Sequence, residues 1–201
     1  MKKKKSSFYL KNPIPIDILY KKGRVMEQLY VINENGMILG LKDRSVVHQN
    51  GLLHLAVQCW VVNDKGEVLI QRRSVTKDKS AGKWDVSFGG HCTGVLENED
   101  IFLANTIKEG REELGLMLTP NDLIKLGEIR YVSQNGNNRE LLGIFLTTCF
   151  SNVSFEFTDG EVCEVKWINI DDLEHNILHH TSVYANRIGA LSLLKNYLNN
   201  Q

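Results

Sequence analysis

Short apolar runs alternate with turn residues along most of the chain, a pattern typical of antiparallel strands. Asn35-Gly36 stands between two such runs and is the strongest short signal for a hairpin. Polar, glycine-containing segments at 63–66 and 134–138 separate two further pairs of runs. We therefore expect three hairpins, with strands at 27–33 and 37–41, 52–62 and 67–72, and 123–132 and 141–150.

Two more segments favour strands and two favour helices. We expect strands at 84–88, where Gly89-Gly90 breaks the run, and at 162–170. Helical periodicity extends from about 98 to 114, and Gly115 follows at the position of a helix end. A second amphipathic helix is expected at 182–199, with inward positions Val183, Leu191, Leu194 and Leu198.

Many antiparallel strands with one central and one terminal helix predict an α+β sandwich around a mixed, largely antiparallel sheet. Residues 1–25 contain a lysine run, two prolines and little periodicity, so we expect a basic N-terminal arm there. Residues 26–201 then form one domain that includes the hairpin at 27–41 and the terminal helix at 182–199.

Composition places the protein among ordinary soluble globular chains. The 201 residues are 42% hydrophobic, and 24 Lys and Arg balance 24 Asp and Glu. Zero net charge removes the main argument for binding nucleic acid or an anionic membrane. No apolar run approaches the roughly 20 residues that span a bilayer, and the basic start lacks an apolar core for export. The four cysteines lack disulfide or zinc spacing, which favours reduced thiols and a cytoplasmic location.

Three carboxylates carry the clearest chemical signal. Glu109, Glu112 and Glu113 are spaced i, i+3 and i+4, so on a helix they share one face. They repel one another, and the helix dipole disfavours anions at this C-terminal end. A divalent cation held by oxygen ligands removes both penalties, and Mg²⁺ or Mn²⁺ suits such a cluster. The alternative is a solvated acidic face.

The surrounding sequence resembles the Nudix box. The matching positions are Gly94, Glu109, Glu112, Glu113, Gly115 and Leu116. Three positions depart: Asp100 replaces the early Glu, Lys108 replaces Arg, and Gly110 replaces an apolar residue. The resemblance implies an α/β/α sandwich of the Nudix type, a divalent metal, and attack of a metal-activated water on a diphosphate. Glu97, Glu99 and Asp100 compete for the early acidic position because the loop after Gly90 is lengthened.

A wider pattern is similar to the isopentenyl-diphosphate-isomerase-like branch of this superfamily. Its parts are His54, the segment 69–74, Lys77, the segment 81–85 and Gly89-Gly90-His91. The resemblance implies that Arg73 and Lys77 hold the diphosphate, and Arg72 joins them as a candidate. A guanidinium fork and an ammonium on one strand-to-loop segment are suited to phosphate. The alternative is a hydrated basic loop.

The same resemblance implies a second metal site. His48, His54 and His91 fall at or close to its three histidine positions, and Glu140 matches one of two glutamates. Asn138 occupies the other glutamate position. Three imidazoles and a carboxylate suit Mn²⁺, Zn²⁺ or Mg²⁺. Alternatively, these histidines only hydrogen-bond the backbone.

One position argues against isomerisation. The isomerase uses a Cys directly before the Gly-His pair, and here that position is Gly89, which can neither donate nor accept a proton. A late Glu-Val strand motif adds Glu161, ahead of Glu164, as a base that approaches the metal.

We therefore expect metal-dependent hydrolysis of a small nucleoside or prenyl-type diphosphate, with Glu112, Glu113 and Glu161 as the catalytic side chains. The alternatives are a non-catalytic sensor of a phosphorylated ligand and an isomerase-like enzyme. The expected partner is the small-molecule diphosphate, with neither nucleic acid nor membrane, and a homodimer is one open option for assembly.

Overall fold

The computed structural model describes residues 27–77, 79–94 and 100–201. The predicted basic arm at 1–25 and the acidic candidates Glu97 and Glu99 lie outside the described residues. The strands are β1 (Gln28–Ile32), β2 (Ile38–Asp43), β3 (Leu53–Asn63), β4 (Val68–Arg73), β5 (Trp84–Asp85), β6 (Phe88–His91), β7 (Ile124–Val132), β8 (Arg139–Cys149) and β9 (Val162–Ile168). The helices are α1 (Arg44–Gln49), α2 (Ile101–Leu114), the 3₁₀ turn η2 (Pro120–Asp122), α3 (Ile170–His179) and α4 (Ile188–Leu198).

All nine strands belong to one mixed sheet centred on β3. Every residue of β3 is buried, as expected of a strand that is covered on both faces. β8 runs parallel to β3 along its whole length, from the pair Leu53 and Arg139 to the pair Asn63 and Cys149. The other strand pairs are antiparallel, and the three predicted hairpins are confirmed as β1–β2, β3–β4 and β7–β8.

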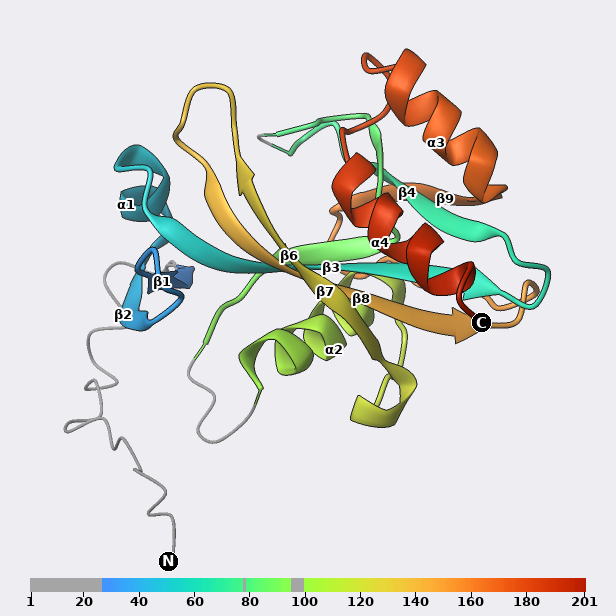
Figure 1. The fold of residues 1–201 in the computed structure, drawn as a ribbon, viewed down its shortest axis with the longest axis horizontal. Helices are drawn as coiled ribbons and strands as arrows, with labels where there is room; N and C mark the ends of the chain where they lie inside the picture. Colours follow the sequence, from blue (N-terminus) through green and yellow to red (C-terminus); the bar gives the residue numbers. More distant parts are fainter. Residues whose placement is uncertain (1–26, 78, 95–99) are drawn as a thin grey trace, which may run out of the picture.

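Helices cover both faces of the sheet. On one face, Trp60, Ile70 and Ile144 pack with Leu191 and Leu194 of α4 and with residues of α3. On the other face, the core includes Leu114 of α2, and Figure 1 shows α2 on the side of β3 opposite α4. The predicted α/β/α sandwich around a mixed, largely antiparallel sheet is therefore confirmed. No helix in the described part of the chain is long and apolar enough to cross a membrane.

The glycine pair after Trp84 does not break a strand, contrary to the sequence-based prediction. Gly89 and Gly90 lie within β6 and pair with Gln58 and Val57 of β3. A Cβ atom on Gly89 would lie 2.4 Å from the carbonyl oxygen of Val57. Glycine is thus required here by the close approach of two backbones. The interruption falls earlier, between β5 and β6, where the Ser87 hydroxyl donates to the Leu69 carbonyl.

The terminal helix is shorter than predicted, because α4 begins at Ile188 and not at 182. The segment before it contains a turn at 181–183 and an isolated bridge at Tyr184. It pairs with β5 through Trp84, which donates to the Val183 carbonyl and accepts from the Ala185 amide. Val183, expected inward, is exposed. Two helices were not predicted from the sequence: α3, which Asn169 caps, and the short helix α1.

Candidate functional site: a carboxylate and histidine cavity

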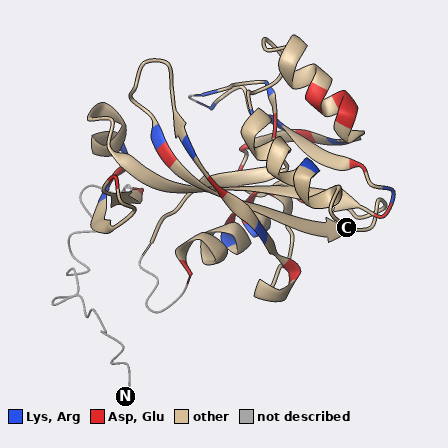
Figure 2. Cartoon of the chain, in the orientation of Figure 1, with Lys and Arg blue, Asp and Glu red and all other residues tan. Residues whose placement is uncertain are grey.

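One cavity of about 640 Å³ joins the C-terminal part of α2 to β6, the loop after β4 and the loop before β9. Most of the side chains around it are polar or charged. Figure 2 shows that Lys and Arg positions are interspersed with Asp and Glu positions along the ribbon. The cavity therefore combines acidic and basic groups and is not a patch of one sign.

Glu113 is buried in the last turn of α2. The Gln71 amide donates to its Oε2 at 2.7 Å, and the backbone N–H of Gly89 donates to the same oxygen at 3.2 Å. Burial, together with the negative charge of Glu109, raises the pKa of Glu113 to about 8. The carboxyl is held firmly, but no lysine or arginine lies at hydrogen-bond distance among the described residues to compensate a negative charge there.

Glu109 lies beside β6, where Gly90 leaves space for it. A Cβ atom on Gly90 would lie 2.5 Å from Glu109 Oε2. Burial raises the pKa of Glu109, although the nearby Lys108 ammonium opposes that shift. Lys108 donates to Glu109 at 2.9 Å and to Glu112 at 2.7 Å, so lysine retains the ion pairing expected of the usual arginine. Glu112 is exposed at the cavity wall, whereas Glu109 and Glu113 are buried.

The carboxylates that the structure groups together are not the three expected on one face of a helix. Ligand oxygens of Glu113, Asp159 and Glu161 all lie within 4.8 Å of one another. Glu161 also forms an ion pair with Lys77. Burial raises the pKa of Asp159, a residue that the sequence analysis did not select. Three hard oxygen donors with one lysine partner fit Mg²⁺ or Mn²⁺ well, because a divalent ion offsets their mutual repulsion.

Of the three predicted phosphate-binding residues, two face the cavity and Arg72 does not. Arg73 and Lys77 line the cavity, and Arg73 Nη1 is 3.7 Å from Asp85 Oδ2. Arg72 does not line it, because successive strand side chains point to opposite faces. Arg72 instead donates to Glu164 at 2.9 Å. The structure therefore does not support Arg72 as a substrate-binding residue or Glu164 as a base.

Asp100 is also separated from the carboxylate group. Its Oδ1 accepts from the Leu103 amide at 3.2 Å, which makes Asp100 the N-cap of α2. Glu113 lies thirteen positions further along the helix, a distance of about 20 Å at 1.5 Å per residue. The structure therefore does not support Asp100 as a ligand of the same metal and shows it as the cap of α2.

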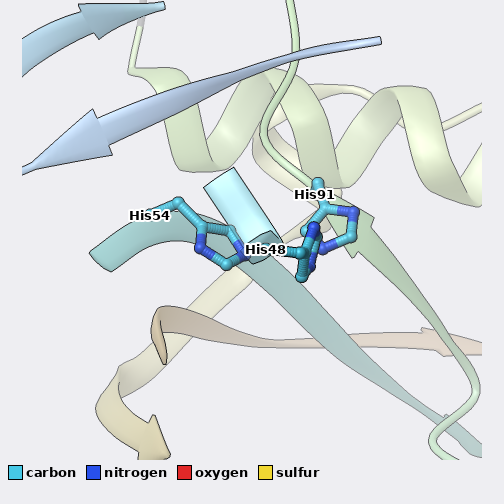
Figure 3. Close-up of side chains that lie close together, drawn as sticks. All are labelled: His48, His54 and His91. Carbon is cyan, nitrogen blue, oxygen red and sulfur yellow. The ribbon is translucent and has the colours of Figure 1, made fainter. Parts of the chain in front are cut away.

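The three histidines converge, as Figure 3 shows. Potential ligand nitrogens of His48, His54 and His91 lie within 4.8 Å of one another. The Nδ1 atom of His48 is 2.9 Å from the Arg44 carbonyl oxygen, and that of His54 is 2.9 Å from the Leu52 carbonyl oxygen. A carbonyl only accepts, so each Nδ1 carries the proton and each Nε2 keeps a free lone pair.

Both of those Nε2 atoms are buried and have no hydrogen-bond partner among the described residues. Burial lowers the pKa of His54 to about 4, and it also lowers the pKa of His48. The two rings are therefore neutral at physiological pH, the form that binds metals. An unpartnered buried nitrogen is costly, and a bound cation removes that cost. The donor set fits Mn²⁺ or Zn²⁺.

Two carboxylates flank this histidine group. Glu140 Oε1 is 3.9 Å from His54 Nε2 and 3.8 Å from His91 Nε2. Glu27 Oε1 is 3.5 Å from His91 Nδ1, on the other side of the ring. Asn138, which occupies the second glutamate position of the resembled site, donates a hydrogen bond to Glu140 at 2.7 Å. The amide therefore orients the Glu140 carboxylate.

Sequence reasoning missed Gln71, Asp159 and Glu27. Gln71 precedes two arginines at the end of a strand whose first four residues are buried, and it points away from exposed Arg72 because strand side chains alternate. Asp159 precedes a glycine turn next to Glu161, so it was close to a residue already selected. Glu27 carries no sequence signal, because it comes close to His91 only when β1 pairs with β3 and with the residues after β6.

An α/β/α sandwich with helix carboxylates beside a polar cavity is the architecture of the Nudix class, which the sequence motifs resemble. Residues 52–186 match the model of the NUDIX domain, and the chain belongs to this family. It is 32% identical over 153 residues to an uncharacterized Nudix hydrolase of Clostridium acetobutylicum, covering 73% of this chain and 72% of that protein. It is 30% identical over 155 residues to an isopentenyl-diphosphate Δ-isomerase of Shigella boydii, covering 75% and 81% respectively.

Solved structures show the same fold. DR0079 from Deinococcus radiodurans aligns with a TM-score of 0.64 at 20% identity, covering 83% of this chain and 98% of that one. The NUDIX domain of Shewanella oneidensis NrtR, solved with ADP ribose, aligns with a TM-score of 0.51 at 13% identity, covering 72% and 87%. The relatives support an enzyme of the Nudix type.

Proposed function

We propose that this protein hydrolyses a diphosphate linkage in a small organic diphosphate, of nucleoside or prenyl type, with Mg²⁺ or Mn²⁺. The observation that carries the proposal is the convergence of buried Glu113 with Asp159 and Glu161, which line the same cavity as Arg73 and Lys77. Acidic oxygens for a cation and basic groups for phosphate thus meet in one place.

Glu113, Asp159 and Glu161 would hold the cation, with Glu109 and Glu112 near it on α2. A bound divalent ion neutralises diphosphate charge and acidifies water, which is the chemistry that this site requires. Arg73 and Lys77 neutralise the phosphate oxygens and the charge that develops on the leaving group. Gln71 fixes the Glu113 carboxylate through its 2.7 Å hydrogen bond.

The chemical step is attack of water oxygen on one phosphorus atom. A new P–O bond forms, the bridging P–O bond breaks, and the water proton passes to a carboxylate and then to solvent. We favour Glu161 over Glu112 as this base, because Glu161 lies with Glu113 and Asp159 at the proposed cation site, whereas Glu112 is exposed on α2 and does not belong to that group. The products are two phosphomonoesters, or one phosphomonoester and phosphate.

We also propose that His48, His54 and His91, with Glu140, form a second cation site in the same region. The buried unpartnered Nε2 atoms of His48 and His54 support this assignment. Equilibrium dialysis with Mn²⁺ tests it. We expect His54→Ala to lose one bound ion per chain, and equal stoichiometry in both proteins would contradict the site.

A non-catalytic sensor of a phosphorylated ligand is the second candidate function. It is favoured by Lys108, whose ammonium neutralises Glu109 and Glu112 without a metal. Binding without turnover in Mg²⁺ would support it. Isomerisation is not supported, because Gly89 has no proton-transfer group and a Cβ there would meet the Val57 carbonyl oxygen. A cytoplasmic location and a homodimer stay predictions.

Glu113→Gln tests the proposed hydrolase. The substitution removes a charged ligand but keeps the shape, so we expect a loss of metal-dependent hydrolysis of about 100-fold or more. The assay is phosphate release from a panel of nucleoside and prenyl diphosphates in millimolar Mg²⁺ or Mn²⁺. Glu128→Gln is the matched control, because Glu128 is an exposed carboxylate on β7 that pairs with Lys125. An active wild type with an equally active Glu113→Gln variant would refute the assignment.

A further inference from the structure

Asp85 lies between two arginines at the wall of the cavity. Arg187 donates from Nε and Nη2 to the two carboxylate oxygens of Asp85, at 2.6 and 2.9 Å. Arg73 Nη1 is 3.7 Å from Asp85 Oδ2, which is too far for a hydrogen bond. All three residues line the cavity. One carboxylate therefore holds one arginine firmly and attracts the other only at longer range.

Arg187 reaches Asp85 because the segment before α4 pairs with β5. The Ala185 amide donates to the Trp84 carbonyl at 2.8 Å, which places Arg187 beside the residue that follows Trp84. Arg187 comes directly after residues 52–186, so the part of the chain that matches the NUDIX domain does not include it. The cavity is thus completed by a residue outside the matched region.

Asp85 is ionised although it is buried. The residue is 5% exposed, and burial opposes its negative charge, but the charges of Arg187 and Arg73 outweigh that effect and lower its pKa. A buried carboxylate that loses its cationic partner is costly, so it favours any other cation within reach. Among the described residues, Arg73 is the other cation within 4.0 Å of Asp85. Loss of Arg187 would therefore draw Arg73 onto Asp85.

Arg73 has donors that remain available for a phosphate group. Its Nε donates to the Lys79 carbonyl at 3.2 Å, and its two Nη atoms donate no hydrogen bond to a described residue. Lys77, the other predicted phosphate-binding residue in the cavity, already pairs with Glu161. The affinity of the cavity for a diphosphate therefore depends on whether Arg73 is free or is held by Asp85.

We propose that Arg187 is a positioning residue for diphosphate binding: it satisfies Asp85 and thereby keeps Arg73 free to bind phosphate. This inference rests on the proposed function for the position of the diphosphate at Arg73. Two guanidinium groups and one carboxylate leave one net positive charge at this wall of the cavity. Arg187 supplies that surplus without contacting the substrate.

Substitutions at the buried pair change this net charge in a defined order. Arg187→Gln leaves Asp85 to pair with Arg73, so no net positive charge remains for the anion. Asp85→Asn removes the carboxylate and leaves both guanidinium groups. The double variant again has one positive charge, on Arg73. It also avoids an unpaired buried charge, because both partners of the pair have become neutral amides.

Binding of methylenediphosphonate, a diphosphate analogue that resists hydrolysis, tests the inference without requiring turnover. Titration calorimetry in millimolar Mg²⁺ measures the Kd of each variant. We expect Arg187→Gln to weaken binding at least about tenfold, as for the loss of one hydrogen bond to a charged group. Asp85→Asn should bind at least as tightly as the wild type. The double variant should return to within about threefold of the wild type.

A second comparison shows whether Arg187 acts through Arg73. Arg73→Gln should weaken binding by itself, and the addition of Arg187→Gln should change the Kd by no more than about twofold. Arg130→Gln is the matched control, because Arg130 is one of two arginines that pair with Glu34, an exposed carboxylate outside the cavity. Its Kd should equal that of the wild type. Thermal melting shows which variants are folded.

The rescue by Asp85→Asn distinguishes positioning from a merely structural role. A folded double variant that binds more than about tenfold more weakly than the wild type would overturn the inference, because Arg187 would then contribute by itself. This comparison holds even where Arg187→Gln alone does not fold. Unchanged affinity in a folded Arg187→Gln variant would also overturn it.

The same measurements separate this inference from the proposed function. A wild-type protein that does not bind the analogue would refute the proposed diphosphate site. The expected order of affinities without phosphate release from any substrate of the panel would refute the hydrolase and support the role of Arg187 in binding.

Discussion

Glu113 shows how one side chain acquires its properties from its neighbours. The helix places it beside Glu109, the sheet places Gln71 against it, and burial raises its pKa to about 8. The carboxyl is thus protonated in the metal-free protein near neutral pH and must lose that proton to bind a cation.

This shift predicts a pH dependence of stability in the metal-free protein. Native Glu113 keeps its proton up to about pH 8, whereas an unfolded carboxyl with the ordinary pKa of 4.5 has lost it. The native state therefore binds more protons in this window, and the free energy of unfolding falls as pH rises, by up to about 1.4 kcal/mol per pH unit.

Urea denaturation in EDTA between about pH 6.5 and pH 8 measures how the free energy of unfolding changes with pH. This range lies above the ordinary pKa of histidine, so most histidines contribute little to the change. Glu113→Gln should flatten it, because glutamine does not titrate. The same slope in the variant and the wild type would show that Glu113 does not carry the effect.

Glu27 gives a second prediction at this scale. Two histidine Nδ1 atoms face backbone carbonyls, whereas that of His91 faces the Glu27 carboxylate at 3.5 Å. Carboxylates in this position orient metal-binding imidazoles, so Glu27→Gln should weaken Mn²⁺ binding at the histidine site about 10- to 100-fold. Titration of free Mn²⁺ by electron paramagnetic resonance measures it.

Glu34→Gln is the control for Glu27, because Glu34 is an exposed carboxylate that pairs with Arg130 and Arg139. Unchanged Mn²⁺ affinity in Glu27→Gln would show that Glu27 does not orient the His91 imidazole for metal binding. A wild-type protein that binds no Mn²⁺ through its histidines would instead refute the second site itself.

At the scale of elements, the packing and capping of α2 explain why Gly110 and Asp100 differ from the residues of the family motif. Gly110 has no space for a larger residue, since a Cβ there would lie 2.9 Å from Leu118 and 3.1 Å from the Phe88 ring. Asp100 caps the helix, which ends at Gly115 in the left-handed region, with φ of 71°. The helix is therefore defined at both ends by local chemistry, independently of any metal.

Asp100→Ala should lower the free energy of unfolding by about 1 kcal/mol through loss of the N-cap. Mg²⁺ affinity should stay the same, because the residue is far from the carboxylate group. Urea denaturation and calorimetric titration measure the two quantities. A large loss of Mg²⁺ affinity with unchanged stability would restore Asp100 as a ligand.

At the scale of the whole molecule, the sheet holds two potential cation sites along one cavity. Glu109 and His91 line the same 640 Å³ space from α2 and β6. Because these sites consist of side chains from distant segments, binding of a cation stabilises the folded chain relative to the unfolded chain.

Saturating Mg²⁺ or Mn²⁺ should therefore raise the melting temperature. A free ion concentration of 100 times Kd increases the free energy of unfolding by about 2.7 kcal/mol. EDTA should reverse the shift, and Glu113→Gln should reduce the part due to Mg²⁺. Differential scanning calorimetry measures it. A melting temperature that is independent of both ions would argue against resident cation sites.

Hairpin signals, helical periodicity and the Glu109, Glu112 and Glu113 spacing are properties of near neighbours in the chain. The sequence alone was therefore sufficient to predict three hairpins, the central helix and its carboxylate-bearing turn. It was insufficient at 182–187, where pairing with β5 overrides helical periodicity. Spacing also placed Asp100 among the candidates for the early acidic position, whereas the structure shows that it caps α2.

Which distant groups meet was decided only by the tertiary structure. Residues 42 positions apart, Gln71 and Glu113, share a hydrogen bond, and Glu27 reaches His91 across the sheet. Arg187 joins Asp85 from a separation of 102 residues. These contacts depend on strand order and register, which are set by burial of the whole core and not by any local pattern.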